Sequence, residues 1–460
     1  MNKMKNDFSK GSITKNIMRL AIPMTVAQLI NVLYSVMDRI YLGMLPEDAT
    51  LSLTGIGVAL PIITLVSAFT NLFGMGGAPL CSIARGRGEN EEAECIMGNS
   101  FVLLVGVGVL LTILGLLFKK PLLFLFGASE ATFQYANDYI SIYLCGSLFV
   151  MIGLGMNGFI NAQGFARVGM WTVILGALVN MILDPIFLFV FHMGVKGAAF
   201  ATVIAQSVSA IWVMQFLTSE RCQLKLKLKC FRLKKERVKQ ITGLGLAGFI
   251  MAVTNGSVQI ICNATLAQFG GDLYIGVMTI INTIREVVVM PVQGLTNGAQ
   301  PVIGYNYGAK QYHRVKEAIR FTSIVCIIYT LVVWGGLNTW PQVFIKCFTQ
   351  ETEVLYATVD ALKIYFFGFF MMAFQFAGQS VFVALGKSKQ AVFFSLLRKA
   401  IIVVPLTMLL PHLFGLGHNG VFMAEPISNL IGGIACFTTM CIVVGKELKE
   451  GNSKDRTLER

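Results

Sequence analysis

Apolar residues form twelve long runs along the chain, separated by short polar segments. The runs are centred near residues 30, 63, 106, 149, 180, 207, 254, 286, 327, 370, 401 and 431. A helix needs roughly 20 mostly apolar residues to cross a bilayer. No stretch shows the alternating pattern of an outer-membrane strand. The pattern therefore predicts an all-α integral membrane protein with twelve transmembrane helices.

The composition agrees with this interpretation. Hydrophobic residues make up 55% of the 460 residues and charged residues only 13%, where a soluble domain carries about 25% charged residues. The first apolar run contains Pro23 and Asp38 and lacks a small-residue cleavage site, so we expect a retained span and not a signal peptide. A soluble enzyme and a secreted disulfide scaffold are both poor fits.

The formal net charge of +13 comes from bases whose distribution predicts the orientation of the chain in the membrane. On one side of the twelve proposed spans, the only bases in the connections are Lys119, Lys120, Lys196 and Lys346. Basic residues favour the cytoplasmic side of a membrane. We therefore predict that both termini are cytoplasmic, and we expect no nucleic-acid partner.

The two halves of the chain resemble each other at an offset of about 222 residues. Matched pairs include Pro79 with Pro301, Gly146 with Gly368, Gly164 with Gly386, Pro185 with Pro405 and Gly197 with Gly420. Each half holds six spans, so both halves enter the membrane in the same orientation. We predict two six-helix lobes related by a pseudo-twofold along the membrane normal, an arrangement found in transporters. A channel or receptor is the less favoured class.

Polar segments set the expected domain boundaries. These are an N-terminal segment (1–16), a first lobe (17–217), a basic linker (218–240), a second lobe (241–444) and a tail (445–460). The linker could contact anionic lipid, but a solvated cytoplasmic connection between the lobes is the favoured interpretation.

Acidic residues inside the apolar runs need a reason, because an acid at the bilayer centre costs about 2.5–3.5 kcal/mol on insertion scales. Asp38 lies late in the first span and Asp184 late in the fifth, one helical turn after Asn180. Thr202 lies near the start of the sixth span, at a similar depth. Carboxylate, amide and hydroxyl oxygens suit a proton or a hard monovalent cation, so these residues predict a cation site. Val404 replaces Asp184 in the second half.

Structural alternatives stand beside this hypothesis. Asp38 could simply pair with Arg39, although neighbouring helical residues point about 100° apart. Pro23 removes a backbone hydrogen bond from the same span, and is either a hinge or a tolerated kink. Tyr139 and Asn157 share one face of the fourth span, where they either extend the polar network or bond to neighbouring helices.

Polar and Met residues also interrupt the spans of the second half. The candidates for lining a substrate cavity are Gln259, Glu286, Met290, Gln375 and Gln379. We expect Glu425 to lie at the external edge of the last span without a function. We also expect few buried bases within the spans.

Other chemistry is not predicted. The ten cysteines are scattered, without a CxxC pair or a nearby His, so neither a metal site nor a disulfide is expected. Glycine clusters such as Gly74-Met75-Gly76-Gly77 and Gly153-Leu154-Gly155 lie inside apolar runs, which favours close helix packing over phosphate binding. We expect no enzymatic activity and no cofactor.

On these residues the chain resembles the multidrug and toxic compound extrusion (MATE) family of the multidrug/oligosaccharidyl-lipid/polysaccharide exporter superfamily. The matching segments are Pro23, Met37 to Gly43, Asn157 to Gly164, Asn180 to Pro185, Gly194 to Thr202 and Gly298 to Ala309. The resemblance covers about residues 12–445. It implies a first-lobe cation site at Asp38, Asn180, Asp184 and Thr202, with Tyr139 and Asn157 in the neighbouring network.

The resemblance also implies a function. It is secondary active efflux of amphipathic, cationic drug-like compounds by antiport with H⁺ or Na⁺, through alternating access in a prokaryotic cytoplasmic membrane. We expect a monomer whose partners are the substrate, the coupling cation and the lipid bilayer. The alternative within the superfamily is a lipid-linked oligosaccharide flippase, for which we would expect a more cationic cavity.

Overall fold

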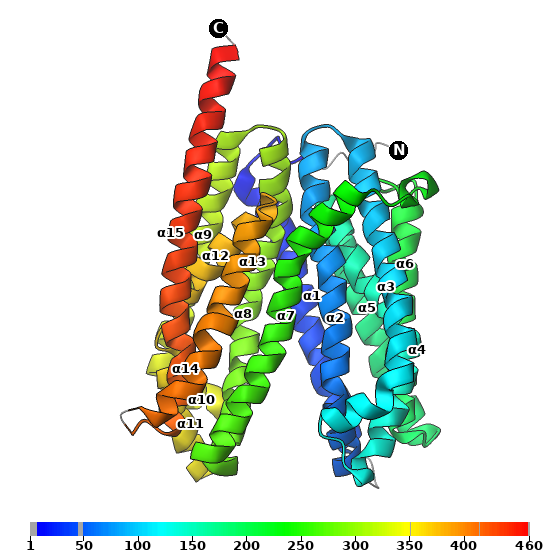
Figure 1. Ribbon diagram of the computed structural model, residues 1–460, viewed down its shortest axis with the longest axis vertical. Coiled ribbons are helices and arrows are strands. Elements are labelled where there is room, and N and C mark those ends of the chain that lie inside the picture. The colour runs from blue at the N-terminus through cyan, green and yellow to red at the C-terminus, as the bar shows by residue number, and fades with distance from the viewer. Residues whose placement is uncertain (1–6, 45–48, 350, 414, 459–460) are drawn as a thin grey trace. The chain divides into compact units, whose positions relative to one another are not determined.

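The computed structural model describes residues 7–44, 49–349, 351–413 and 415–458, with side chains as far as Glu450. Within these ranges the chain is helical and contains no strand (Figure 1). Eleven helices are long and apolar enough to cross a membrane, and a bent helix pair raises the number to twelve. The predicted all-α membrane fold is confirmed.

The helices of the first half lie on the predicted apolar runs. They are α1 (Ile13–Gly43), α2 (Ala49–Gly86), α3 (Asn90–Leu125), α4 (Glu130–Ala162), α5 (Ala166–Pro185) with a π-helical extension (Ile186–Val190), α6 (Gly194–Thr218) and a short 3₁₀ turn (Leu228–Phe231).

The second half follows the same order with more interruptions. Its helices are α7 (Lys235–Phe269), α8 (Gly271–Gly308), α9 (Tyr312–Thr339), α10 (Pro341–Ile345), α11 (Thr352–Phe366), α12 (Met372–Ala384), α13 (Ser388–Leu396), α14 (Val404–Leu409) and α15 (His418–Leu458). A 3₁₀ turn (Phe369–Met371) joins α11 to α12, a π-helical segment (Leu397–Val403) joins α13 to α14, and a 3₁₀ turn (Leu410–His412) follows α14.

Two compact units divide the chain. The first contains residues 22–252, and the second contains residues 8–21 together with the chain from 253 onward. The helices α1 and α7 therefore each contribute residues to both units. In α1 the division falls next to Pro23, where the missing N–H interrupts the backbone hydrogen bonds.

In the first unit, α4 packs against α2, α3 and α6, and α5 packs against α6. The helices α2 and α4 approach closely at two glycines: a Cβ on Gly74 would lie 2.9 Å from Gly155 Cα. Helices in membranes use such small residues to bring their backbones together. The prediction that these glycines serve helix packing is confirmed.

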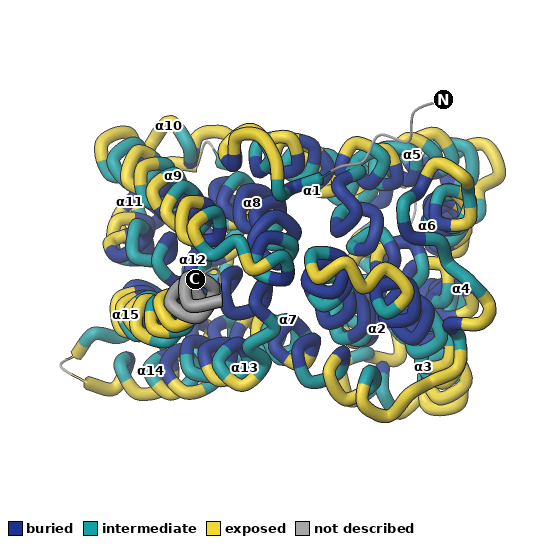
Figure 2. The backbone as a smooth tube through the Cα atoms, turned by 90° about the horizontal axis from the view of Figure 1, so that it is seen from above, coloured by how far each residue is buried: buried dark blue, intermediate teal, exposed yellow. Residues whose placement is uncertain are grey.

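Apolar side chains in this unit face outward as well as inward. In the most apolar 18-residue window of α3 only 17% of residues are buried within the protein, against 61% in α4. Figure 2 shows the exposed positions along α3. Exposed apolar surface on this scale would be unstable in water but is expected where a helix faces lipid.

The linker exposes most of its bases, as a solvated connection would, but one side of it is packed against α3. Lys227 Nζ lies 2.6 Å from Glu94 Oε2, and Asn99 Nδ2 donates to the Cys230 carbonyl at 2.9 Å. Glu91 pairs with Lys229 and raises the pKa of that ammonium above its ordinary value. The acids at the start of α3 therefore neutralise part of the basic run.

A disulfide joins the linker to the same helix. It links Cys95 of α3 to Cys230, 135 residues away. The expectation that no disulfide forms is wrong. The spacing along the sequence carried no signal, because only the folding of the linker onto α3 brings the two thiols together.

In the second unit, α8 packs against α9 and α12, and α12 packs against α15. The pair α11 and α12 bends by 41° where the helix is interrupted at Phe366–Phe369. The π-helical segment 397–403 introduces wider backbone turns, which are frequent at functional sites.

Candidate functional site

Three helices of the first unit bring the predicted cation-site residues together. Asp38 comes from α1, Asn180 and Asp184 from α5, and Thr202 from α6. The carboxyl groups of Asp38 and Asp184 lie within hydrogen-bonding reach of each other. Asn180 Nδ2 donates to Asp184 Oδ1 at 3.4 Å. Asp184 is completely buried, and Asn180 and Thr202 are buried beside it.

One oxygen of each of these residues has no hydrogen-bond partner among the described residues. The four buried atoms are Asp38 Oδ1, Asn180 Oδ1, Asp184 Oδ2 and Thr202 Oγ1. A buried polar atom without a partner costs about 1–3 kcal/mol. Four of them in one cluster leave oxygen atoms that a shared proton or a bound cation would satisfy.

Three tyrosines complete the cluster. The phenols of Tyr34 and Tyr139 lie close to the Thr202 hydroxyl, and the Tyr139 ring stacks on that of Tyr143 with centroids 6.2 Å apart. The sequence predicted Tyr139 but missed the other two. A signal was present, because Tyr34 precedes Asp38 by four residues and Tyr143 follows Tyr139 by four, each on the same helix face.

The structural alternatives can now be located. Asp38 and Arg39 form no ion pair in the described part of the chain, and Arg39 is exposed. Asn157 Nδ2 donates to the Gly169 carbonyl of α5 at 3.2 Å, and Asn157 Oδ1 accepts from Thr172 at 3.4 Å. Asn157 thus forms a helix–helix contact, five helical turns from Tyr139.

A second cluster, which the sequence did not predict, lies in the second unit around Glu425 of α15. Lys399 Nζ lies 3.0 Å from Glu425 Oε2, while Arg398 Nη1 and Arg285 Nη1 lie 3.3 Å and 3.6 Å from Oε1. The expectation that Glu425 lies at the external edge of its span is wrong, since this residue is buried inside the unit and is only 5% exposed. So is the expectation of few buried bases, because Lys399 is 2% and Arg398 8% exposed.

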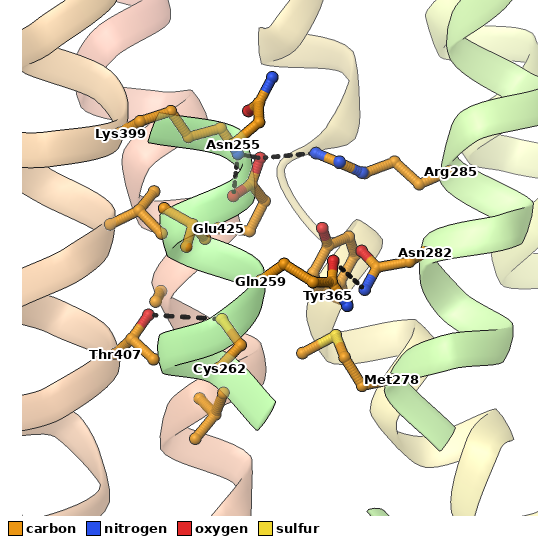
Figure 3. A pocket seen from close by; sticks show the side chains of 14 residues that line it. Asn255, Gln259, Cys262, Met278, Asn282, Arg285, Tyr365, Lys399, Thr407 and Glu425 are labelled. Atoms are coloured by element: carbon orange, nitrogen blue, oxygen red, sulfur yellow. Dashed lines mark hydrogen bonds and ion pairs between the residues drawn. The ribbon is translucent and has the colours of Figure 1, made fainter. Parts of the chain in front are cut away.

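A small cavity opens beside this cluster, with a volume of about 30 Å³ (Figure 3). Its polar lining comes from α7, α8, α11, α14, α15 and the π-helical segment, and consists of Asn255, Gln259, Asn282, Arg285, Tyr365, Lys399, Thr407 and Glu425. The Arg285 Nε atom is buried and has no hydrogen-bond partner within the described ranges. Three bases around one acid give this cluster, here called the base cluster, a formal charge of +2.

Of the five candidate cavity residues, Gln259 lines this cavity. Its Oε1 accepts a hydrogen bond from Asn282 Nδ2 at 3.2 Å. Glu286 follows Arg285 on α8 but is exposed and does not line the cavity, and Met290 is buried in the unit.

The other two candidates make contacts between helices. Gln375 is buried, and its backbone carbonyl accepts a weak hydrogen bond from Cys436 Sγ of α15 at 3.8 Å. Gln379 Nε2 donates to the Ala391 carbonyl and to Ser395 Oγ, each at 2.9 Å. Neither residue lines the cavity in Figure 3.

The fold and these two sites define a polytopic helical membrane protein with ionisable groups buried inside both of its units, which is typical of secondary transporters. The family model described as MatE matches residues 23–186 and 248–409, more than half of the chain. The chain therefore belongs to the MatE family, and the resemblance predicted from the sequence is confirmed.

Proteins of similar sequence support this assignment. The chain is 24% identical over 438 residues to the multidrug export protein MepA of Staphylococcus haemolyticus (strain JCSC1435), covering 95% of this chain and 94% of that protein. It is 24% identical over 430 residues to MepA of Staphylococcus aureus (strain NCTC 8325 / PS 47), covering 93% of each.

Among solved structures, an outward-facing multidrug resistance MATE family transporter of the MOP superfamily superposes with a TM-score of 0.90 at 22% identity. A MATE in complex with MaL6 gives a TM-score of 0.91 at 22% identity. Each alignment covers 98% of this chain and 100% of the other. At this identity the likeness establishes the fold.

Proposed function

We propose that this chain is a secondary active multidrug transporter, which exports amphipathic organic compounds across a bacterial cell membrane by antiport with H⁺ or Na⁺. Membership of the MatE family and the multidrug export relatives support transport. The positive-inside charge pattern supports cytoplasmic termini. Coupling to a cation is inferred from the first unit.

The observation that carries the proposal is the acid cluster around Asp38 and Asp184. Two carboxyl groups in contact inside an apolar unit repel each other unless a proton or a metal cation lies between them. Four unpartnered oxygens from three helices surround that position. Such oxygens suit a hard cation and are equally able to share a proton.

Coupling requires that the cation binds two conformations with different affinity. Asp38 belongs to α1, which also carries Pro23 at the boundary between the compact units. We propose that cation binding draws the Asp38 end of α1 toward Asp184 and that α1 bends near Pro23 when the cation leaves. The change in α1 then alternates the exposure of the substrate path.

The test is efflux of a cationic dye from vesicles that contain the purified protein, with pH and sodium gradients imposed separately. We expect one gradient alone to drive efflux and thereby to identify the ion. The variants Asp38→Asn and Asp184→Asn should lose gradient-driven efflux while inserting at normal levels. Efflux at the parental rate from both variants would contradict the proposal.

A matched control is Asp138→Asn in α4. Asp138 faces Lys196 at 3.5 Å in a partly exposed pair outside the cluster, and exposed ion pairs contribute about 0–1 kcal/mol. We expect this variant to retain coupled efflux. An equal loss in all three variants would show that removal of any carboxylate disturbs the protein.

The base cluster favours a second candidate, a flippase for lipid-linked oligosaccharides, whose anionic linkage would suit buried bases. Deletion of the gene separates the two functions. Loss of drug tolerance with normal cell-envelope synthesis supports export, whereas defective envelope synthesis with unchanged drug tolerance supports the flippase.

A further inference from the structure

We infer that the second unit contains an anion-binding site, in which Arg285, Arg398 and Lys399 bind the carboxylate, phosphate or sulfonate group of an amphiphilic substrate. This inference rests on the proposed transport function for its biological role and extends it by naming a substrate class. Amphiphiles that carry such a group, as zwitterions or anions, should bind more tightly than otherwise similar cations without one.

The positive charges of the base cluster exceed its negative charge. Among the described residues, Glu425 is the single acid within 4 Å of the three bases, and it can neutralise only one of them. An unpaired charge in a membrane interior is costly, so ionisable residues there are found with partners or beside a ligand path. A purely structural ion pair would need one base for one acid. An anionic ligand would neutralise the surplus positive charge.

The three bases of the cluster share one acceptor oxygen and offer further hydrogen-bond donors. Glu425 Oε1 is shared by both arginines and by Lys399 Nζ, so none of the three bases has this oxygen to itself. Arg285 Nε is buried and has no partner in the described chain. In Figure 3 the guanidinium of Arg285 and the ammonium of Lys399 point at Glu425 from opposite sides. Guanidinium groups bind carboxylates and phosphates through paired hydrogen bonds.

The cavity gives a ligand access to the base cluster. Lys399 and Glu425 are buried, whereas Asn255 and Gln259, which line the same cavity, are exposed. The cavity volume of about 30 Å³ corresponds to about two water-sized groups, since one needs roughly 10–15 Å³. That is the size of the two oxygens of a carboxylate. Val258, Met278 and Val421 supply apolar surface for the body of an amphiphile.

The experiment compares two dyes that differ by one carboxylate. Rhodamine 110 carries a free carboxylate, and rhodamine 123 is its methyl ester and therefore a cation. Binding to the full-length protein in detergent, without any gradient, is measured by fluorescence polarisation. A charge-assisted hydrogen bond contributes about 1.5–3 kcal/mol, so we expect rhodamine 110 to bind about tenfold or more tightly than its ester.

Variants test the cluster through its net charge. Arg285→Gln lowers the charge to +1 and should weaken rhodamine 110 binding about tenfold or more, with little change for the ester. Glu425→Gln removes the competing carboxylate and should strengthen binding of the acid dye. The double variant Lys399→Met/Glu425→Gln keeps the charge at +2 and should retain the preference. Lys363→Gln removes an exposed base of α11 and is the control.

The direction of the Glu425→Gln effect is decisive. If Glu425 served only to hold the fold together, its loss would weaken binding of both dyes. Equal affinity for the two dyes, or an equal loss for both in Arg285→Gln, would overturn the inference. If Glu425→Gln fails to fold, Arg285→Gln and the double variant still test it.

Inorganic phosphate distinguishes a free anion from a substrate group. We expect phosphate to compete with rhodamine 110 but not with the ester. Phosphate that stabilises the protein against heat while both dyes bind equally would overturn the assignment to a substrate. Because no gradient is used, loss of the dye preference refutes the anion site alone, whereas loss of gradient-driven efflux refutes the proposed function.

Discussion

The two compact units share one plan of helices and carry opposite charges at their centres. In the first unit, Asp38 and Asp184 meet beside Thr202, with several oxygens unpartnered. In the second unit, Val404 stands where the repeat places Asp184, and Glu425 stands where it places Thr202, at the offset of 223 that also relates Gly197 to Gly420. Three bases then surround that acid.

The shared plan survives in smaller features. Tyr143 and Tyr365 are separated by 222 residues, and each lies beside the charged site of its own unit. A π-helical segment accompanies both sites, directly after Pro185 in the first unit and around Lys399 in the second. The two halves therefore share a backbone plan and differ in the charges that it carries, in agreement with the cation site proposed for the first unit and the anion site proposed for the second.

The largest effect expected from this comparison concerns the acid at the centre of each unit. Glu425→Gln leaves three bases, of which Arg398 and Lys399 are buried, without a counter-charge and should destabilise the protein by about 3–5 kcal/mol. Asp184→Asn relieves the repulsion between two carboxylates and should cause no such loss at alkaline pH in sodium-free buffer. Thermal unfolding of the purified variants in detergent measures the difference. A similar loss in both variants would mean that the two acids play the same structural role.

The sequence revealed the first site because its acids interrupt otherwise apolar runs. Asp38 and Asp184 are the single acids of α1 and α5, and helical geometry places Asn180 on the face of Asp184. The second site escaped prediction for a physical reason. Arg398 and Lys399 lie near the middle of one apolar run and Glu425 near the start of another. The sequence does not show which of these helices meet, and only the packing of α8, α15 and the π-helical segment brings the three residues together.

The linker shows the same limit. Its many bases indicate a solvated segment, and residues 218–240 contain nothing that predicts their attachment to α3. Glu91, Glu92 and Glu94 at the start of α3 provide the counter-charges, but acids in the first helical turn are common for reasons of the helix dipole alone. The pairing of Cys95 with Cys230 depends on that attachment.

The disulfide gives the next prediction, since it belongs to the first unit and has no counterpart in the second, where Glu317 occupies the position equivalent to Cys95. A cross-link that closes a long loop stabilises by about 2–4 kcal/mol. The variant Cys95→Ser/Cys230→Ser should therefore unfold at a lower temperature than the oxidised parent protein. Addition of a reductant should remove the difference between the two. If the difference persists, the serines themselves disturb the packing of the linker.

The smallest expected effect tests whether the units remain equivalent where no charge is involved. Asn157 donates to the Gly169 carbonyl, and Gln379 donates to the Ala391 carbonyl, with both donor and acceptor displaced by 222 residues. Hydrogen bonds between membrane helices contribute about 0.6 kcal/mol on average. Asn157→Leu and Gln379→Leu should therefore lower the thermal unfolding midpoint by similar, small amounts.

The same two variants should leave dye binding and gradient-driven efflux intact, because neither side chain reaches the acid cluster or the cavity beside Glu425. Equal and small losses of stability would show that the repeat still governs the frame of both units while their charged centres have separated. A loss of coupled efflux in Asn157→Leu alone would instead place this residue in the cation network. Asn157 and Gln379 would then have different roles in the two units.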